Sequence, residues 1–163
     1  NISCKGCHGS HAVAASSAAD SRWNAARVTE SCAACHKAEK SEYLVSWHGE
    51  AVRKGVQGAP NCLDCHLQAV SKGHFAGDTL SAKIAHEKLC LSCHLDGHSI
   101  RSRVAPSAGF LNMYEQSVHG VALARGDSRA AGCVDCHGSH GIIPGGDSRS
   151  SVFKLKIPGT CAR

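Results

Sequence analysis

The sequence has few of the side chains that normally build a protein core. Only seven of its 163 residues are aromatic (two Trp, two Tyr and three Phe) and only one is methionine, whereas 17 are glycine. A domain of this length ordinarily buries a sizeable apolar core. The shortage predicts that something other than side chains fills the interior.

Long apolar runs are also missing. No stretch of 18 apolar residues occurs, so the sequence contains no candidate membrane span. No signal peptide stands before Asn1, as expected of a mature or excised chain. The abundant residues are instead the metal-ligating ones, 11 Cys and 12 His. A chain so rich in cysteine is expected outside the cytosol.

The cysteines form five Cys-x-x-Cys-His motifs: "CKGCH", "CAACH", "CLDCH", "CLSCH" and "CVDCH". In this signature two thiols bind the haem vinyl groups covalently and the adjacent imidazole becomes the proximal iron ligand. Zinc sites and disulfides also use paired cysteines, but neither requires a histidine after each second cysteine. We therefore expect five c-type haems, attached at Cys4, Cys7, Cys32, Cys35, Cys62, Cys65, Cys90, Cys93, Cys133 and Cys136, with proximal ligands His8, His36, His66, His94 and His137.

The motifs recur at fixed distances, which divides this single module into repeats at approximately 1–42, 43–113 and 114–163. Cys4 and Cys32 are separated by the same interval as Cys133 and Cys161. Cys161 thus holds the place of the first cysteine of a sixth motif, which predicts that the chain is part of a longer protein with a sixth haem. The alternative is that Cys161 is a free or disulfide-bonded thiol.

A second repeat lies between the motifs. "YLVSWHGEAVRKG" (43–55) and "YEQSVHGVALARG" (114–126) share Tyr, Ser, His and Gly at the same offsets. The apolar spacing predicts a helix of about three turns in each, ended by Gly55 or Gly126. We expect each Tyr and Ser to pack beside the histidine or to orient its ring by a hydrogen bond.

These segments resemble bacterial multihaem c-type cytochromes, in which Tyr-x-x-Ser-x-His-Gly alternates with Cys-x-x-Cys-His-Gly-x-His; the class includes octahaem tetrathionate reductase-like and cytochrome c3-like proteins. "YEQSVHG" through "CVDCHGSHGI" to "IPGTC" is the most specific stretch. The resemblance implies a mainly α fold, with long loops and short helices wrapped around closely packed haems and little or no sheet. It also implies electron transfer in the periplasm or at the cell surface of a respiring bacterium.

Histidines outside the motifs are enough to give every iron a second imidazole. His11 and His140 follow their proximal histidines too closely to reach the far side of the same porphyrin, so each would serve a neighbouring haem or none. The repeats suggest that His48 and His119 bind the haems at Cys62 and Cys133, and that His11, His74 and His140 bind those at Cys32, Cys90 and Cys161. His86 and His98 have no counterpart in the other repeats and are equally compatible with iron or with solvent and propionate contacts.

Two classes of function follow. Six-coordinate bis-histidine haems transfer electrons but cannot bind a substrate, which favours a respiratory conduit. Its partners would be redox proteins, namely a quinol-side donor, a terminal reductase or other cytochromes. The alternative is part of a nitrogen or sulfur oxyanion reductase with one open catalytic haem. Self-association into filaments is compatible with the first class.

The formal charge of +5 does not indicate nucleic-acid binding. Ionised haem propionates would bring the total to about 0 in the oxidised protein, so no nucleic-acid partner is expected. Lys37, Lys40, Arg53, Lys54, Arg101 and Arg103 are expected to pair with propionates or to face redox partners.

Overall fold

The computed structural model describes residues 10, 13–15, 17–66, 79–95, 109 and 111–162. Within these ranges the regular structure is helical and contains no strand, which confirms the mainly α prediction at that level. The helices are α2 (Val28–Ala33), α3 (Lys37–Val45), α4 (Trp47–Arg53), α5 (Cys62–His66), α7 (Thr79–His94), α9 (Val118–Ala124), α10 (Cys133–His137) and α11 (Ile157–Cys161).

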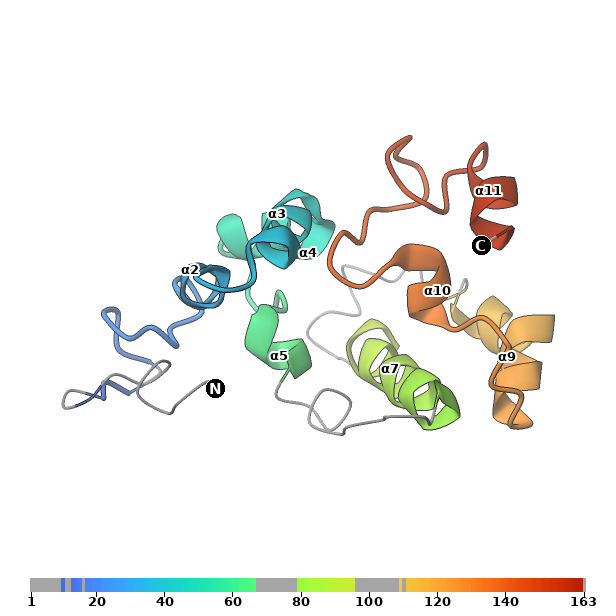
Figure 1. Cartoon of the computed structure of the whole chain (residues 1–163), viewed down its shortest axis with the longest axis horizontal. Coiled ribbons are helices and arrows are strands. Elements are labelled where there is room, and N and C mark those ends of the chain that lie inside the picture. Colours follow the sequence, from blue (N-terminus) through green and yellow to red (C-terminus); the bar gives the residue numbers. More distant parts are fainter. Residues whose placement is uncertain are drawn as a thin grey trace.

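The helices are spread along the long axis of the molecule. Figure 1 shows α2 near one end, α3, α4 and α5 next, α7 and α10 beyond them, and α9 and α11 near the other end. Contacts join α2 to α3, α3 to α4, α2 to α5 and α7 to α10. The helices therefore form a series of neighbours rather than one bundle around a central core.

The predicted single helix over 43–55 is wrong, because the chain turns a corner at Ser46. The backbone of Ser46 is extended, with φ −77° and ψ 160°, and separates α3 from α4. Its buried hydroxyl accepts a hydrogen bond from the Gly49 amide at 3.0 Å and donates one to the Tyr43 carbonyl at 2.7 Å. Ser46 is thus the N-cap of α4, and this role is favoured because helix N-termini carry unpaired amides.

Glycine at position 49 is required by the close approach of the two helices at this corner. A Cβ atom built there would lie only 2.1 Å from the Tyr43 carbonyl oxygen. At the other end of α4, Gly55 has φ 66°. The Val56 amide bonds to the Ala51 carbonyl and the Gly55 amide to the Val52 carbonyl, both at 3.0 Å, which is a Schellman motif. The prediction that Gly55 ends a helix is confirmed.

The second Tyr–Ser–His–Gly segment, 114–126, forms the same corner. Ser117 is extended and its hydroxyl accepts from the Gly120 amide at 3.2 Å. A Cβ atom on Gly120 would lie 2.4 Å from the Tyr114 carbonyl oxygen. Gly126, with φ 90°, ends α9 through the same pair of backbone bonds. The prediction for Gly126 is therefore confirmed as well.

The described residues bury very little apolar surface. Their buried hydrophobic side chains are Val28, Ala33, Leu123 and Ala130, whereas Val118 and Leu155 are 80% and 78% exposed. A fold held only by its side chains would normally bury a larger fraction of its large apolar residues. The helices are therefore stabilised mainly by local caps and turns in the polypeptide itself.

Candidate haem sites

The third and fifth motifs form short helices that an internal aspartate caps. The Asp64 carboxylate accepts a hydrogen bond from the Asn61 amide, and Asp135 accepts one from Gly132, each at 2.7 Å. Both caps close the first turn, in which the two cysteines and the histidine follow one another. The local sequence thus presents both thiols and the imidazole from one helical turn.

The corner segments hold these short helices through their tyrosines. The Tyr43 hydroxyl donates to the Pro60 carbonyl at 2.8 Å, and the Tyr114 hydroxyl donates to the Ala131 carbonyl at 2.9 Å. Each carbonyl lies two residues before a first cysteine. The tyrosines thus tie a corner to an attachment motif, and the serines cap helices. Within the residues that the structure describes, neither pair has the expected hydrogen bond to an imidazole.

The four described motifs are neighbours in chain order. The Cys62 thiol donates to the Thr29 hydroxyl of α2 at 4.0 Å. Burial raises the pKa of Cys65, and the nearby charges of Asp64 and Cys93 raise it further. A hydrogen bond between the Cys90 and Cys133 thiols raises the pKa of the first and lowers that of the second.

A salt bridge secures the contact between the fourth and fifth motifs. Lys83 of α7 lies 3.1 Å from the Asp135 carboxylate and donates to the Ala130 carbonyl at 2.8 Å. The Lys83 side chain is mostly buried. One cation therefore joins the helix that carries Cys90 to the cap of the helix that carries Cys133.

His140 lies beside the proximal histidine of the third motif. The ring centres of His66 and His140 are 6.1 Å apart and their planes differ by 18°. The Nδ1 atom of His140 lies 3.8 Å from the Glu42 carboxylate and 3.4 Å from the Ser139 hydroxyl. A partner on one ring nitrogen fixes the orientation of an imidazole and leaves the other nitrogen for a metal.

His48 lies beside the proximal histidine of the fourth motif. The ring centres of His48 and His94 are 6.0 Å apart and their planes differ by 44°. The Trp47 amide, at the first position of α4, donates to the Ile142 carbonyl at 3.0 Å. This bond joins the start of the helix that carries His48 to the loop that carries His140, so the two histidines share one support.

The repeats suggest other partners for these two histidines, and that pairing stays a prediction. They suggest His48 for the haem at Cys62 and His140 for that at Cys161, whereas the rings that the two side chains approach belong to His94 and His66. Sequence distance alone missed this because both approaches depend on contacts between distant segments. His140 does reach a different motif from its own, as its short distance from His137 required.

Burial favours the neutral form of four of the described histidines. Burial lowers the pKa of His48, and the nearby His94 lowers it further. Burial also lowers the pKa of His66, with further contributions from His140 and His36. Burial lowers the pKa of His94, and burial and then His94 lower that of His137. An imidazole must be neutral to donate its lone pair to a metal.

Other predicted ligands have different surroundings. His119 is exposed on α9, and its ring has no described contact with His137. His86 of α7 has a buried Nδ1 atom without a hydrogen-bond partner among the described residues. Several residues with predicted roles lie outside the described residues, namely Cys4, Cys7, His8, His11, His74, His98, Arg101 and Arg103.

Cys161 occupies the same local structure as Cys32. The buried Ser21 and Ser150 hydroxyls each donate to a carbonyl seven residues earlier, at 3.5 and 2.8 Å. The Ser31 and Thr160 hydroxyls, one residue before each cysteine, each bond to a carbonyl nine residues earlier. The equal spacing in sequence is thus matched by equal hydrogen bonding, although few residues are identical.

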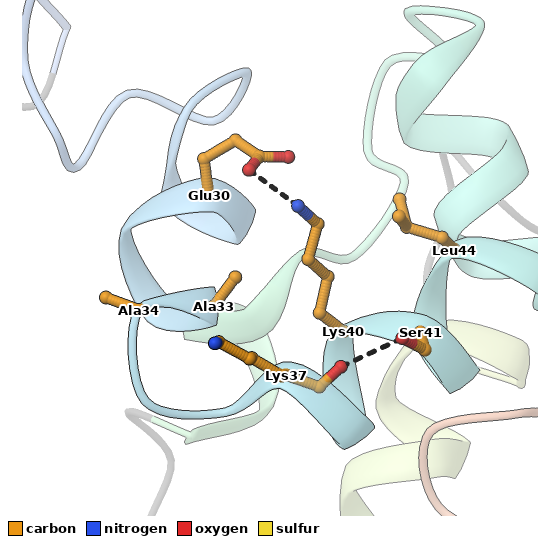
Figure 2. A pocket seen from close by; sticks show the side chains of 7 residues that line it. All are labelled: Glu30, Ala33, Ala34, Lys37, Lys40, Ser41 and Leu44. Carbon is orange, nitrogen blue, oxygen red and sulfur yellow. Dashed lines mark hydrogen bonds and ion pairs between the residues drawn. The ribbon is translucent and has the colours of Figure 1, made fainter.

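A shallow hollow of about 500 Å³ lies beside the second motif (Figure 2). Ala33 and Ala34, which separate Cys32 from Cys35, line it together with Lys37, Lys40 and other residues of α2 and α3. Lys40 reaches across to Glu30, with 2.6 Å between the amine and the carboxylate (Figure 2). Lys40 is therefore ion-paired within the chain, and its role toward propionates or partners stays a prediction.

The described donor set fits c-type haem. Each motif offers the two thiols and the imidazole that attachment uses, and a second imidazole ring lies near that of the third and of the fourth motif. The small polypeptide core and the unpartnered His86 nitrogen are compatible with large apolar groups inside the fold. No cluster of three or more metal-ligating side chains occurs in the described ranges, and none is needed for a haem.

Several contributing residues were not anticipated from the sequence. Glu42 lies beside the ring of His140, and Asp64 and Asp135 cap two motif helices. Lys83 joins the fourth motif to the fifth. The two aspartates had a detectable signal, since both stand immediately before the second cysteine at equivalent places in the repeat. Glu42 and Lys83 contact distant segments, so the sequence contained no local signal for their roles.

Comparison with family models, curated proteins and solved structures found no match. None of the helices described is both long and apolar enough to cross a membrane.

Proposed function

We propose that this chain is an electron carrier, a multihaem c-type cytochrome with five covalently attached and mostly bis-histidine haems. The observation that carries the proposal is the arrangement of the motifs. Each described motif lies beside the next, and two of their proximal histidines face a second imidazole. Neighbouring motifs would hold neighbouring haems close enough for electrons to pass between them.

Haem supplies a one-electron centre whose potential depends on its axial ligands, burial and nearby charge. The polypeptide would fix each haem through two thioethers and hold two neutral imidazoles on its iron. A six-coordinate iron with two imidazoles has no open position for a substrate, which favours transfer over catalysis. The expected partners are redox proteins in the periplasm or at a bacterial cell surface, which such carriers contact through small transient interfaces.

The intact mass of the denatured protein tests the proposal, because covalent haems survive denaturation. We expect the mass of the 163-residue chain plus five haems. A matched variant, Cys133→Ser with Cys136→Ser, should lose one haem and keep the other four. A mass equal to the bare polypeptide, from a host that matures c-type cytochromes, would contradict the proposal.

Carbon monoxide then separates a carrier from a reductase. A reduced protein in which every haem has two histidines should keep its spectrum under carbon monoxide. An open catalytic haem would bind the gas and change its absorption. That result would replace the carrier by the reductase of a nitrogen or sulfur oxyanion.

A further inference from the structure

The two imidazole pairs have the spacing of ligands on opposite sides of one iron. A bond of about 2 Å to each nitrogen, plus about 1.1 Å from that nitrogen to its ring centre, puts trans imidazole centres about 6 Å apart. The described pairs are 6.1 and 6.0 Å apart. Rings in direct face-to-face contact would lie closer, at about 3.5–4 Å.

Each pair also has the right composition. One member is the proximal histidine of an attachment motif, in α5 or α7, and the other is a histidine outside every motif. The His48, His94 and His140 side chains are partly buried, whereas His66 is exposed.

We infer that His66 and His140 are the two axial ligands of the haem at Cys62 and Cys65, and that His94 and His48 are those of the haem at Cys90 and Cys93. The inference rests on the proposed function, because it assigns ligands within it. It differs from the repeat-based pairing, which assigns His48 to the haem at Cys62, His74 to that at Cys90 and His140 to that at Cys161. The distal ligand of one haem comes from a later part of the chain and that of the next haem from an earlier part.

The contacts that hold His48 and His140 explain why each would bind a haem of a distant motif. The bond from the Trp47 amide to the Ile142 carbonyl holds the start of α4 against the loop that follows α10. Glu42, at the same corner, faces Nδ1 of His140 and leaves Nε2 for iron. One junction between distant segments therefore delivers a ligand to each of two neighbouring haems.

Single histidine-to-alanine variants test the pairing. His140→Ala and His48→Ala should each leave one iron with an open position, measured as high-spin ferric haem by electron paramagnetic resonance and as carbon monoxide binding after reduction. His119→Ala is the matched control, from the same Tyr–Ser–His–Gly motif but exposed, and should leave both assigned haems low-spin. If His119→Ala opened the haem at Cys62 or Cys90, the pairing would be wrong.

The pair is identified by removing one attachment site at a time. In a chain with Cys62→Ser and Cys65→Ser, His140→Ala should open no further iron, whereas His48→Ala still should. In a chain with Cys90→Ser and Cys93→Ser, His48→Ala should open no further iron, whereas His140→Ala still should. The opposite pattern would support the repeat-based pairing of His48 with Cys62 and overturn the inference.

A second measurement keeps the test valid if the four-haem chains do not fold. His140→Met and His48→Met keep each iron six-coordinate in the five-haem protein and exchange one imidazole for a thioether, which raises the haem potential. Near-parallel imidazole planes give a more rhombic low-spin signal than planes at a larger angle. His140→Met should therefore remove the signal of the 18° pair and His48→Met that of the 44° pair. Loss of neither signal, or of the wrong one, would overturn the inference.

The two proposals fail in different ways. If no haem is attached, the intact mass equals that of the bare chain and the proposed function fails before any ligand is tested. If five haems are attached but the variants give the wrong pattern, the function stands and only the pairing is wrong.

Discussion

The two Tyr–Ser–His–Gly corners, 43–55 and 114–126, have the same internal bonds but different surroundings. In each, a serine caps the second helix, a glycine passes close to the tyrosine carbonyl, and the tyrosine hydroxyl reaches the segment before a motif. Yet His48 is partly buried and faces His94, whereas His119 is exposed. The motif thus specifies the corner, and the rest of the chain decides what the histidine faces.

The largest effect is expected where the corner tolerates no side chain. Gly49→Ala and Gly120→Ala would each push a methyl group into a backbone carbonyl, which cannot move without opening the corner. We expect each to destabilise the protein by about 2–3 kcal/mol, as overpacking does. We expect Gly49→Ala, and not Gly120→Ala, also to disturb a low-spin haem, because within the described residues His48 faces His94 and His119 faces no such ring. Chemical denaturation followed by circular dichroism, together with the haem spectrum, measures both effects.

Gly146→Ala is the control for this comparison, since nothing lies within 4 Å of a Cβ atom there. It should unfold at the same denaturant concentration as the parent. If both corner variants matched it, the two close approaches would be irrelevant to stability. If Gly120→Ala disturbed the haem spectrum as strongly as Gly49→Ala, the contrast between the corners would fail.

A smaller effect is expected at the tyrosines. Tyr43→Phe and Tyr114→Phe each remove one hydrogen bond to a backbone carbonyl and should each cost about 1 kcal/mol. Burial is the main cause that raises the pKa of both phenols from 10.0 to about 12. Because the folded pKa is the higher one, this stability is fully present below pH 10 and is lost as pH rises toward about 12.

The measurement is the denaturation midpoint of the parent and of each Phe variant from neutral pH to about pH 12. The difference between parent and variant should shrink over the last two units. Since the bond is the same in both corners, the two variants should behave alike, in contrast to the glycine pair. A difference that stayed constant with pH would mean that the phenol proton does not contribute.

How far the sequence predicts the structure depends on the range of the interaction involved. The helix-ending roles of Gly55 and Gly126 follow from local rules, and the structure confirms them. The break at Ser46 was missed because a three- or four-residue apolar spacing continues across it and suggests one helix. A local signal was nevertheless present. Ser46 stands three residues before Gly49, and its hydroxyl accepts a hydrogen bond from the Gly49 amide.

How far the candidate site can be predicted also depends on the range of the interactions involved. The attachment residues stay a prediction from the five motifs, whereas the structure shows that Cys161 and Cys32 have equivalent local hydrogen bonds, as their spacing suggests. The neighbours of His48 and His140 could not be read, because they depend on the bond between Trp47 and Ile142 and on the contact with Glu42. Those contacts join segments that no repeat relates.

The smallest effect is expected on the outer faces of the corner helices. The exposed Glu50 and Lys54 of α4 form an ion pair at 2.6 Å, whereas α9 has Val121 and Arg125 at the equivalent places. Lys54→Ala should lower the thermal midpoint slightly, and high salt should remove the difference, because exposed pairs at this spacing are weak and screened. Val121→Glu should give α9 a similar pair with Arg125 and a small, salt-sensitive gain. If high salt left either difference unchanged, a change in helix propensity rather than the ion pair would be its cause.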